Sequence, residues 1–294
     1  MCNKKFLLLL IISFLLIVAC SAHAQGVKCG WLALNGISAE GAELLKRQGV
    51  SIWEWGVYSP SHGEDDKIYF YDSLNSMIMA VHAGEIDELI IPQITAEYIV
   101  NVNPDFRISC VGRSHGACFV LGFKEGEGDA LHKKFNEAII AMKRDGTLEK
   151  LQQEYGRKPG TREYEAVKFD KFPGAETVKL AVTGDIPPLD LTTPDDQASG
   201  LSAAVVAEAA RRLKVNIAVV NVDTGARTTT LASGRADIVA WYEQIRDTKN
   251  QYDGARGVLY SEPYHEGEFF MHLRSIELIQ KTNLRQHYRL LNNV

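Results

Sequence analysis

The chain has 294 residues, of which 46% are apolar and 23% are charged, and its formal net charge at pH 7 is −5. These proportions are typical of a soluble globular protein with room for two domains, and they exclude a disordered chain and an all-membrane fold. The mildly acidic balance also argues against nucleic acid as a partner, because binding to phosphates needs clustered Lys and Arg.

The N-terminus has the pattern of an export signal, expected over residues 1–19. Lys4 and Lys5 precede the apolar run 6–19, which suits a signal peptide and falls short of the roughly 20 residues that span a bilayer. Two cleavage sites compete. Cys20 ends a lipobox-like sequence and would carry a lipid anchor, whereas cleavage after Ala24, in an A-x-A-like sequence, would release a free protein. Both interpretations place the protein in the periplasm or outside the cell, in the first case as a membrane-anchored lipoprotein.

Residues 27–156 are expected to form one lobe of alternating strands and helices. A long helix begins near Asp129 and has Leu131, Phe135, Ala138, Ile139 and Met142 on one apolar face. A further short helix is expected to begin at Thr147, whose hydroxyl suits a cap. The remaining expected strands are 27–34, 67–71, 88–91, 107–111 and 117–123, and the remaining helices are 38–47, 73–83 and 93–101.

Three cysteines lie beyond the signal region. Cys110 and Cys118 belong to two consecutive predicted strands, and a hairpin would bring them within reach of a possible disulfide. Cys29 is expected to be a small buried residue. His115, between the two strands, completes no known zinc pattern, so no metal site and no cofactor are predicted.

Residues 157–176 are polar, interrupted by Pro and Gly and without a clear period, which predicts a linker. The second lobe, residues 177–294, opens with the strand TVKLAV, which runs into a Pro-Pro turn. Its other expected elements are a helix at 201–213, a strand at 215–223, a short helix at 226–232, strands at 236–241 and within 257–273, and a terminal helix at 276–291.

One pattern occurs twice, as HAGEIDELII at 82–91 and as ASGRADIVAW at 232–241. In each copy a helix ends at a glycine, Gly84 or Gly234, where a residue free to take positive φ is needed. An Asp then opens an apolar run typical of a strand buried on both faces. Two such units about 150 residues apart predict two α/β lobes of similar build, with a crevice between them for a small ligand.

Several segments together resemble the bacterial extracellular solute-binding proteins of family 3. The resemblance implies a two-lobed fold of the type II periplasmic-binding-protein kind, in which each lobe is a small mixed sheet flanked by helices. It also implies delivery of a small molecule, most often an amino acid, to an ABC transporter permease. The segments that resemble the family's first half are 177–191, 199–223, 231–241 and 260–275, and those that resemble its second half and closing helix are 71–100 and 135–156.

The two halves stand in the opposite order from that of the family. This order predicts a circular permutation, with new termini at one crossing between the lobes and the old termini joined by residues 157–176. The alternative is a fragment of a tandem array, in which case a partner chain would be needed to complete the cleft.

The resemblance places a ligand site where the lobes face each other. Ser38 follows Asn-Gly-Ile at a position where the family has a helix start that binds a carboxylate, although a plain helix N-cap explains it equally well. Asp185 belongs to a D-x-P-P turn at the lip of the cleft, and Arg246 is a candidate partner for a ligand carboxylate despite its unusual spacing. Gln93 stands where amino-acid binders place an Asp. Either Glu243 or Asp185 therefore pairs with a ligand ammonium, or the ligand is not a standard α-amino acid.

Trp241 and Tyr242 end the repeated strand, where the crevice is expected. Stacking or cation–π contact there would suit a flat or cationic ligand, and packing in the core is the alternative.

The expected function is that of an extracytoplasmic solute-binding protein that captures a small polar or charged, amino-acid-like molecule for an ABC importer. A ligand-sensing receptor without a transporter and a dehydratase-like enzyme on the same fold are the alternatives. The sequence has no visible nucleophile–base motif, so no enzymatic activity is predicted.

Overall fold

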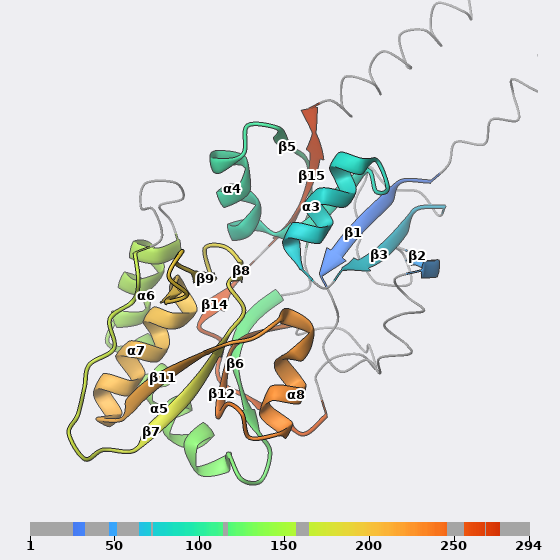
Figure 1. Cartoon of the computed structure of the whole chain (residues 1–294). Coiled ribbons are helices and arrows are strands. Elements are labelled where there is room, and N and C mark those ends of the chain that lie inside the picture. The colour runs from blue at the N-terminus through green and yellow to red at the C-terminus, as the bar shows by residue number, and fades with distance from the viewer. Residues whose placement is uncertain are drawn as a thin grey trace, which may run out of the picture.

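Two six-stranded mixed sheets, here called sheet A and sheet B, organise the chain (Figure 1). The computed structural model describes residues 26–32, 47–51, 65–71, 73–113, 117–156, 165–245, 256–267 and 269–276. The predicted signal peptide, Cys20 and Ala24 lie outside these described residues.

Sheet A has the strand order β2-β3-β1-β4-β15-β5. The strands β1, β3 and β4 run parallel, and β15 runs antiparallel to both of its neighbours. All five residues of β4 are buried, as expected for a strand covered on both faces. The bounds are β1 (Lys28–Leu32), β2 (Val50–Ser51), β3 (Lys67–Tyr71), β4 (Glu88–Pro92), β5 (Phe106–Arg113) and β15 (Phe269–Ser275).

Sheet B has the strand order β11-β7-β12-β6-β13, and β14 pairs with a further part of β6. The strands β11, β7 and β12 run parallel, and β6 runs antiparallel to all of its partners. The bounds are β6 (Ala117–Lys124), β7 (Thr177–Val182), β11 (Asn216–Asn221), β12 (Ile238–Ile245), β13 (Val258–Tyr260) and β14 (His265–Glu266). Three short strands, β8 (Asp185–Ile186), β9 (Asp190–Thr192) and β10 (Ala198–Ser199), form a separate small sheet.

The two large sheets have the same topology. Apart from the short strands β2 in sheet A and β14 in sheet B, both sheets follow one order: the second strand of its half of the sequence, then the first, the third, one strand from the other half, and the fourth. The exchanged strands are β15 in sheet A and β6 in sheet B. The predicted class, an α/β fold of two similarly built lobes, is therefore what the chain forms, and each half of the sequence contributes to both lobes.

The repeat also holds at the level of single hydrogen bonds. Gly84 and Gly234 both have positive φ, 74° and 69°. The Asp87 carboxylate accepts from the backbone N–H of Lys28 at 2.8 Å, and the Asp87 N–H donates to the Lys28 carbonyl. In the second copy, the Asp237 carboxylate accepts from the Lys179 N–H at 2.8 Å, and the Asp237 N–H donates to the Lys179 carbonyl. Each Asp thus ties the start of one parallel strand to the start of its neighbour, which explains why the pattern needs an acceptor at this position.

Helices cover the sheets as their apolar faces require. In α3 (Leu74–Ala83), Ser73 caps the first turn by accepting from the Ser76 N–H at 3.1 Å. In α5 (Asp129–Arg144) the predicted apolar face is buried at Phe135, Ala138, Ile139 and Met142, as expected from the spacing. The other helices are α4 (Gln93–Val102), α6 (Thr147–Leu151), α7 (Leu201–Leu213) and α8 (Arg227–Ala232), with a π-helical turn over Gln152–Gly156.

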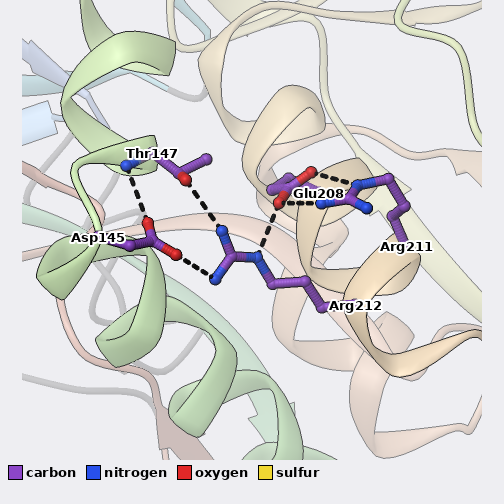
Figure 2. Close-up of polar contacts among 5 residues, drawn as sticks. All are labelled: Asp145, Thr147, Glu208, Arg211 and Arg212. Atoms are coloured by element: carbon purple, nitrogen blue, oxygen red, sulfur yellow. Dashed lines mark hydrogen bonds and ion pairs between the residues drawn. The ribbon is translucent and has the colours of Figure 1, made fainter.

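We call sheet A with α3 and α4 lobe A, and sheet B with α5 to α8 and the small sheet lobe B. The assignment of α5 and α6 follows from their packing on α7 and, for α5, on β6. Arg212 of α7 donates to Asp145 at 2.8 Å and to Thr147 at 2.9 Å, and its third bond goes to Glu208 at 2.7 Å (Figure 2). Residues 129–156 therefore pack against the C-terminal half of the sequence.

The predicted hairpin of two consecutive strands is wrong. Strand β5 pairs with β15 in sheet A, whereas β6 pairs with strands of sheet B. Cys118 is buried as a thiol, so its predicted disulfide with Cys110 is not formed. The reason is that β5 belongs to sheet A and β6 to sheet B, which places the two cysteines in different lobes. Cys29 is fully buried, as expected, and burial raises the pKa of its thiol well above the usual range.

The described part of the expected linker, residues 165–176, has no helix or strand. Two hydrogen bonds attach this segment to lobe B. The Val167 N–H donates to the Ala198 carbonyl at 2.9 Å, and the Phe172 N–H donates to the Asn216 side chain at 2.8 Å. The segment therefore wraps the surface of lobe B.

Candidate functional site

Among the described residues, two cavities between the lobes each include one residue proposed from the sequence. The larger has a volume of about 540 Å³ and includes Gln93, and the smaller has about 280 Å³ and includes Asp185. Small-molecule sites usually occupy about 300–1,000 Å³. The larger cavity is therefore the better candidate for a ligand site.

The walls of the larger cavity come from both lobes. Lobe A supplies the first turns of α4 with Gln93, Ile94 and Glu97, and lobe B supplies the end of α5, α6 with the π-helical turn, and the segment 263–267. That last segment includes β14 and leads directly into β15, so the cavity lies beside one of the two crossings between the lobes.

Polar side chains inside this cavity are held by short hydrogen bonds. Gln93 donates to Glu97 at 2.7 Å, and Gln152 donates to the Tyr264 carbonyl at 2.7 Å. Lys143 lies 3.3 Å from Glu262 and 4.0 Å from Glu266. The cavity therefore combines amides with charges of both signs, and apolar contact comes from Ile94, Leu148 and Pro263.

The smaller cavity separates α3 and α4 of lobe A from the turn between β8 and β9 of lobe B. Asp185, at its edge, accepts from the hydroxyls of Thr183 at 2.5 Å and of Thr224. The Thr183 hydroxyl also lies 2.8 Å from Asp190. Since a hydroxyl has one proton, it donates to only one of the two carboxylates at a time.

Trp241 and Tyr242 lie in the core and line neither cavity, so the expected stacking surface at the end of the repeated strand is wrong. Their exposed fractions are 2% and 0%. The Arg227 guanidinium lies 3.7 Å from the centre of the Trp241 ring and donates to the Trp241 carbonyl at 3.0 Å. The Trp241 indole N–H donates to Thr183 at 2.9 Å. Both α7 and α8 pack against this strand, and Arg227 of α8 takes the cation–π position that a ligand was expected to fill.

The remaining predicted site residues lie wholly or partly outside the described part of the chain. Ser38 and Arg246 lie outside the described residues. Glu243 belongs to β12, but its side chain is also outside the described part.

Sequence reasoning missed Glu97, Lys143, Glu149 and Gln152, which line the larger cavity. Three of them occupy polar positions on α-helices and Gln152 begins the π-helical turn, and such positions normally face water. No signal in the sequence separates them from a solvated helix face, because the cavity arises only when helices from two lobes meet.

Within the described ranges, no group of three or more His, Cys, Asp or Glu side chains is arranged to hold a metal ion. In the same part of the chain no helix is long and apolar enough to cross a membrane.

Comparisons with known proteins agree with the expected family. Residues 178–285 match the model of the bacterial extracellular solute-binding proteins, family 3, and residues 26–156 lie outside the match. No curated protein sequence matches the chain.

Among solved structures, the chain is similar to the ligand-binding component of an ABC-type import system from Staphylococcus aureus, solved with zinc bound. The two are 11% identical over 88% of this chain and 69% of that one, with a TM-score of 0.43. The methionine-binding protein MetQ is 10% identical over 85% and 83%, with a TM-score of 0.35. The periplasmic aliphatic sulphonate-binding protein SsuA from Escherichia coli is 10% identical over 90% and 70%, with a TM-score of 0.33. These similarities are weak, so the fold assignment rests on the chain's own sheets and on the family match.

Proposed function

We propose that this chain, whose residues 178–285 match the model of the family 3 extracellular solute-binding proteins, captures a small polar or charged molecule between its two lobes for an ABC importer. The observation that carries the proposal is the cavity of about 540 Å³, which is walled by both lobes. A ligand in this position contacts lobe A through α4 and lobe B through α5, α6 and the segment 263–267.

The exchanged strands supply a mechanism for capture. The chain crosses between the lobes from β5 to β6 and from β14 to β15, over a few residues each time. Short crossings allow two rigid sheets to rotate about a hinge while their relative position stays limited. Because the second crossing borders the cavity, a ligand that contacts both walls stabilises the closed arrangement and is shielded from water.

The polar lining favours a ligand with hydrogen-bonding and charged groups, which includes amino-acid-like molecules. Gln93 takes the position where the sequence resemblance implies an ammonium-binding Asp. Its amide is bonded to Glu97, one turn further along α4, so a carboxylate is still present at this end of the helix. This replacement keeps an acceptor for a ligand ammonium while moving it along the helix.

The proposal is tested by calorimetry and thermal unfolding of the purified exported protein against a panel of amino acids, polyamines, small carboxylates and aromatic metabolites. A true ligand at 100 times its Kd is expected to raise the free energy of unfolding by about 2.7 kcal/mol. Gln93→Ala should weaken its binding without lowering the unfolding temperature of the unliganded protein, because Gln93 is only half-buried. The absence of any stabilising molecule across the panel would contradict the proposal.

A further inference from the structure

We infer that the larger interlobe cavity selects a small organic cation, held between Glu97 of lobe A and Glu149 of lobe B. The inference rests on the proposed function, since it takes this cavity to be the ligand site. The ligand chemistry follows from the charges that line the cavity, which are those of Glu97, Lys143, Glu149 and Glu266, together with the ionisable His265.

The basic groups of the cavity contribute little positive charge toward a ligand. Lys143 is already near two carboxylates, Glu262 at 3.3 Å and Glu266 at 4.0 Å. Burial disfavours the charged imidazole and lowers the pKa of His265 to about 4, so this side chain is neutral at pH 7. The lining therefore has an excess of negative charge, because Glu97 and Glu149 are not balanced by any basic group of the cavity.

Glu97 and Glu149 are available for a cation from opposite sides. Glu97 accepts from the Gln93 amide at 2.7 Å, and Glu149 accepts from the Gln153 amide at 3.2 Å. Within the described part of the chain neither carboxylate forms an ion pair. An ammonium or guanidinium group between them would replace these neutral contacts by charge-assisted hydrogen bonds, which are about twice as strong.

One feature of the cavity favours an anion instead, namely the N-terminus of α4 at Gln93 and Ile94. A helix N-terminus acts as roughly half a positive charge toward an anion near the surface. Two full carboxylates outweigh it. Because they stand on different lobes, a cation that joins them also draws the lobes together, which a ligand bound to one wall would not do.

The test is isothermal titration calorimetry with agmatine, L-arginine, L-citrulline and succinate. L-Citrulline has the shape of L-arginine with a neutral urea in place of the guanidinium, so the pair isolates the effect of charge. Agmatine or L-arginine is expected to bind, and L-citrulline to bind at least about tenfold more weakly than L-arginine. Glu97→Gln and Glu149→Gln should each weaken binding of the cation about tenfold, which corresponds to about 1.4 kcal/mol. Glu137→Gln, at an exposed position of α5 outside both cavities, is the matched control and should change binding less than twofold.

The outcomes separate this inference from the proposed function. Binding of succinate, or equal binding of L-arginine and L-citrulline, would overturn the cation selectivity and leave the solute-binding function standing. Binding of a cation that is unaffected in both glutamine variants, with their unfolding temperatures unchanged, would place the ligand elsewhere and overturn the inference. If no molecule binds, either here or in the wider panel, the proposed function fails and this inference fails with it.

Discussion

Asp190 is a carboxyl group whose charged form is poorly accommodated in the folded protein. It is fully buried, and its Oδ2 accepts from the Thr183 N–H at 2.8 Å and lies 2.8 Å from the Thr183 hydroxyl, which Asp185 shares, while Oδ1 has no hydrogen-bond partner in the described part of the chain. Removal from water raises its pKa to about 6, the bonds from Thr183 oppose that rise, and the negative charge of Asp185 adds to it. The folded protein therefore holds this proton more tightly than the unfolded chain does.

We predict that Asp190→Asn flattens the pH dependence of stability between about pH 4 and pH 6. In the wild type, folding favours the protonated carboxyl, so the free energy of unfolding falls as pH rises from the usual value of 3.8 toward about 6. A pKa difference of that size corresponds to about 3 kcal/mol, which the wild type should lose relative to Asp190→Asn between pH 4 and pH 7. Urea unfolding of both proteins at several pH values measures the difference, in which the titration of other groups cancels. If the free energy of unfolding changed with pH by the same amount in both proteins, the prediction would be contradicted.

At the scale of single residues, the sequence predicted the backbone conformation of a residue better than it predicted which side chains surround that residue. Gly84 and Gly234 were predicted to end helices, and both have positive φ. Thr147 was predicted to cap a helix, but the N-cap of α6 is Gly146, and the Thr147 hydroxyl accepts from Arg212 instead. Trp241 was misplaced, because its burial depends on Arg227 of a neighbouring helix, and no periodicity in either segment encodes that contact.

At the scale of elements, most of the longer strands and helices in the described part were predicted to within a few residues, because each carries its own pattern of apolar spacing and turn residues. The short strands β2, β8, β9 and β10 were not predicted, and the expected helices 38–47 and 276–291 lie almost wholly outside the described residues. Strand β3 has the predicted bounds, and α4 is one residue longer than expected. The sequence did not predict equally well which strands pair with one another. An apolar run shows that β6 is buried, but it does not show that the strand lies between β12 and β13 of sheet B instead of beside β5.

We predict that Arg212→Ala lowers the free energy of unfolding by about 1–2 kcal/mol, because it removes the charge-assisted bonds between α7 and the start of α6 (Figure 2). The estimate is modest, since Asp145 is about half exposed and water weakens such pairs. Arg211→Ala is the matched control. Arg211 bonds Glu208 on its own helix and, in the described part of the chain, does not reach α5 or α6, so its loss should cost less than about 0.5 kcal/mol.

Denaturant unfolding of the two alanine variants gives both values under one condition. Equal losses in the two variants would mean that the bonds to Asp145 and Thr147 add no stability beyond the contact with Glu208 that both arginines make. A loss confined to Arg212→Ala would show that the side chain holds the two halves of the sequence together.

At the scale of the whole molecule, sheet A explains how the halves of a two-lobed protein can stand in either order. Gly30, Leu89 and Leu273 form one row across β1, β4 and β15. Strand β15 runs antiparallel to β4, so its end and the start of β1 lie at the same end of the sheet. They are separated by two strand spacings, or about 10 Å. A loop of a few residues can span that distance, since each extended residue covers up to about 3.3 Å.

We propose that the order of segments is a circular permutation, and we predict that reversing it preserves the fold. The reordered chain places residues 165–294 first, joins Val294 directly to Gly26, and ends at Gly156. Because both sheets, the exchanged strands and the Arg212 contacts remain intact, it should elute as a monomer, melt within a few degrees of the parent and bind the same ligand. A second chain opened at Gly122, inside β6, interrupts a central strand of sheet B and should not fold. Were the reordered chain to fold only as a dimer, or lose the ligand while the parent keeps it, each lobe would depend on the present order of the chain and the permutation would be the wrong account.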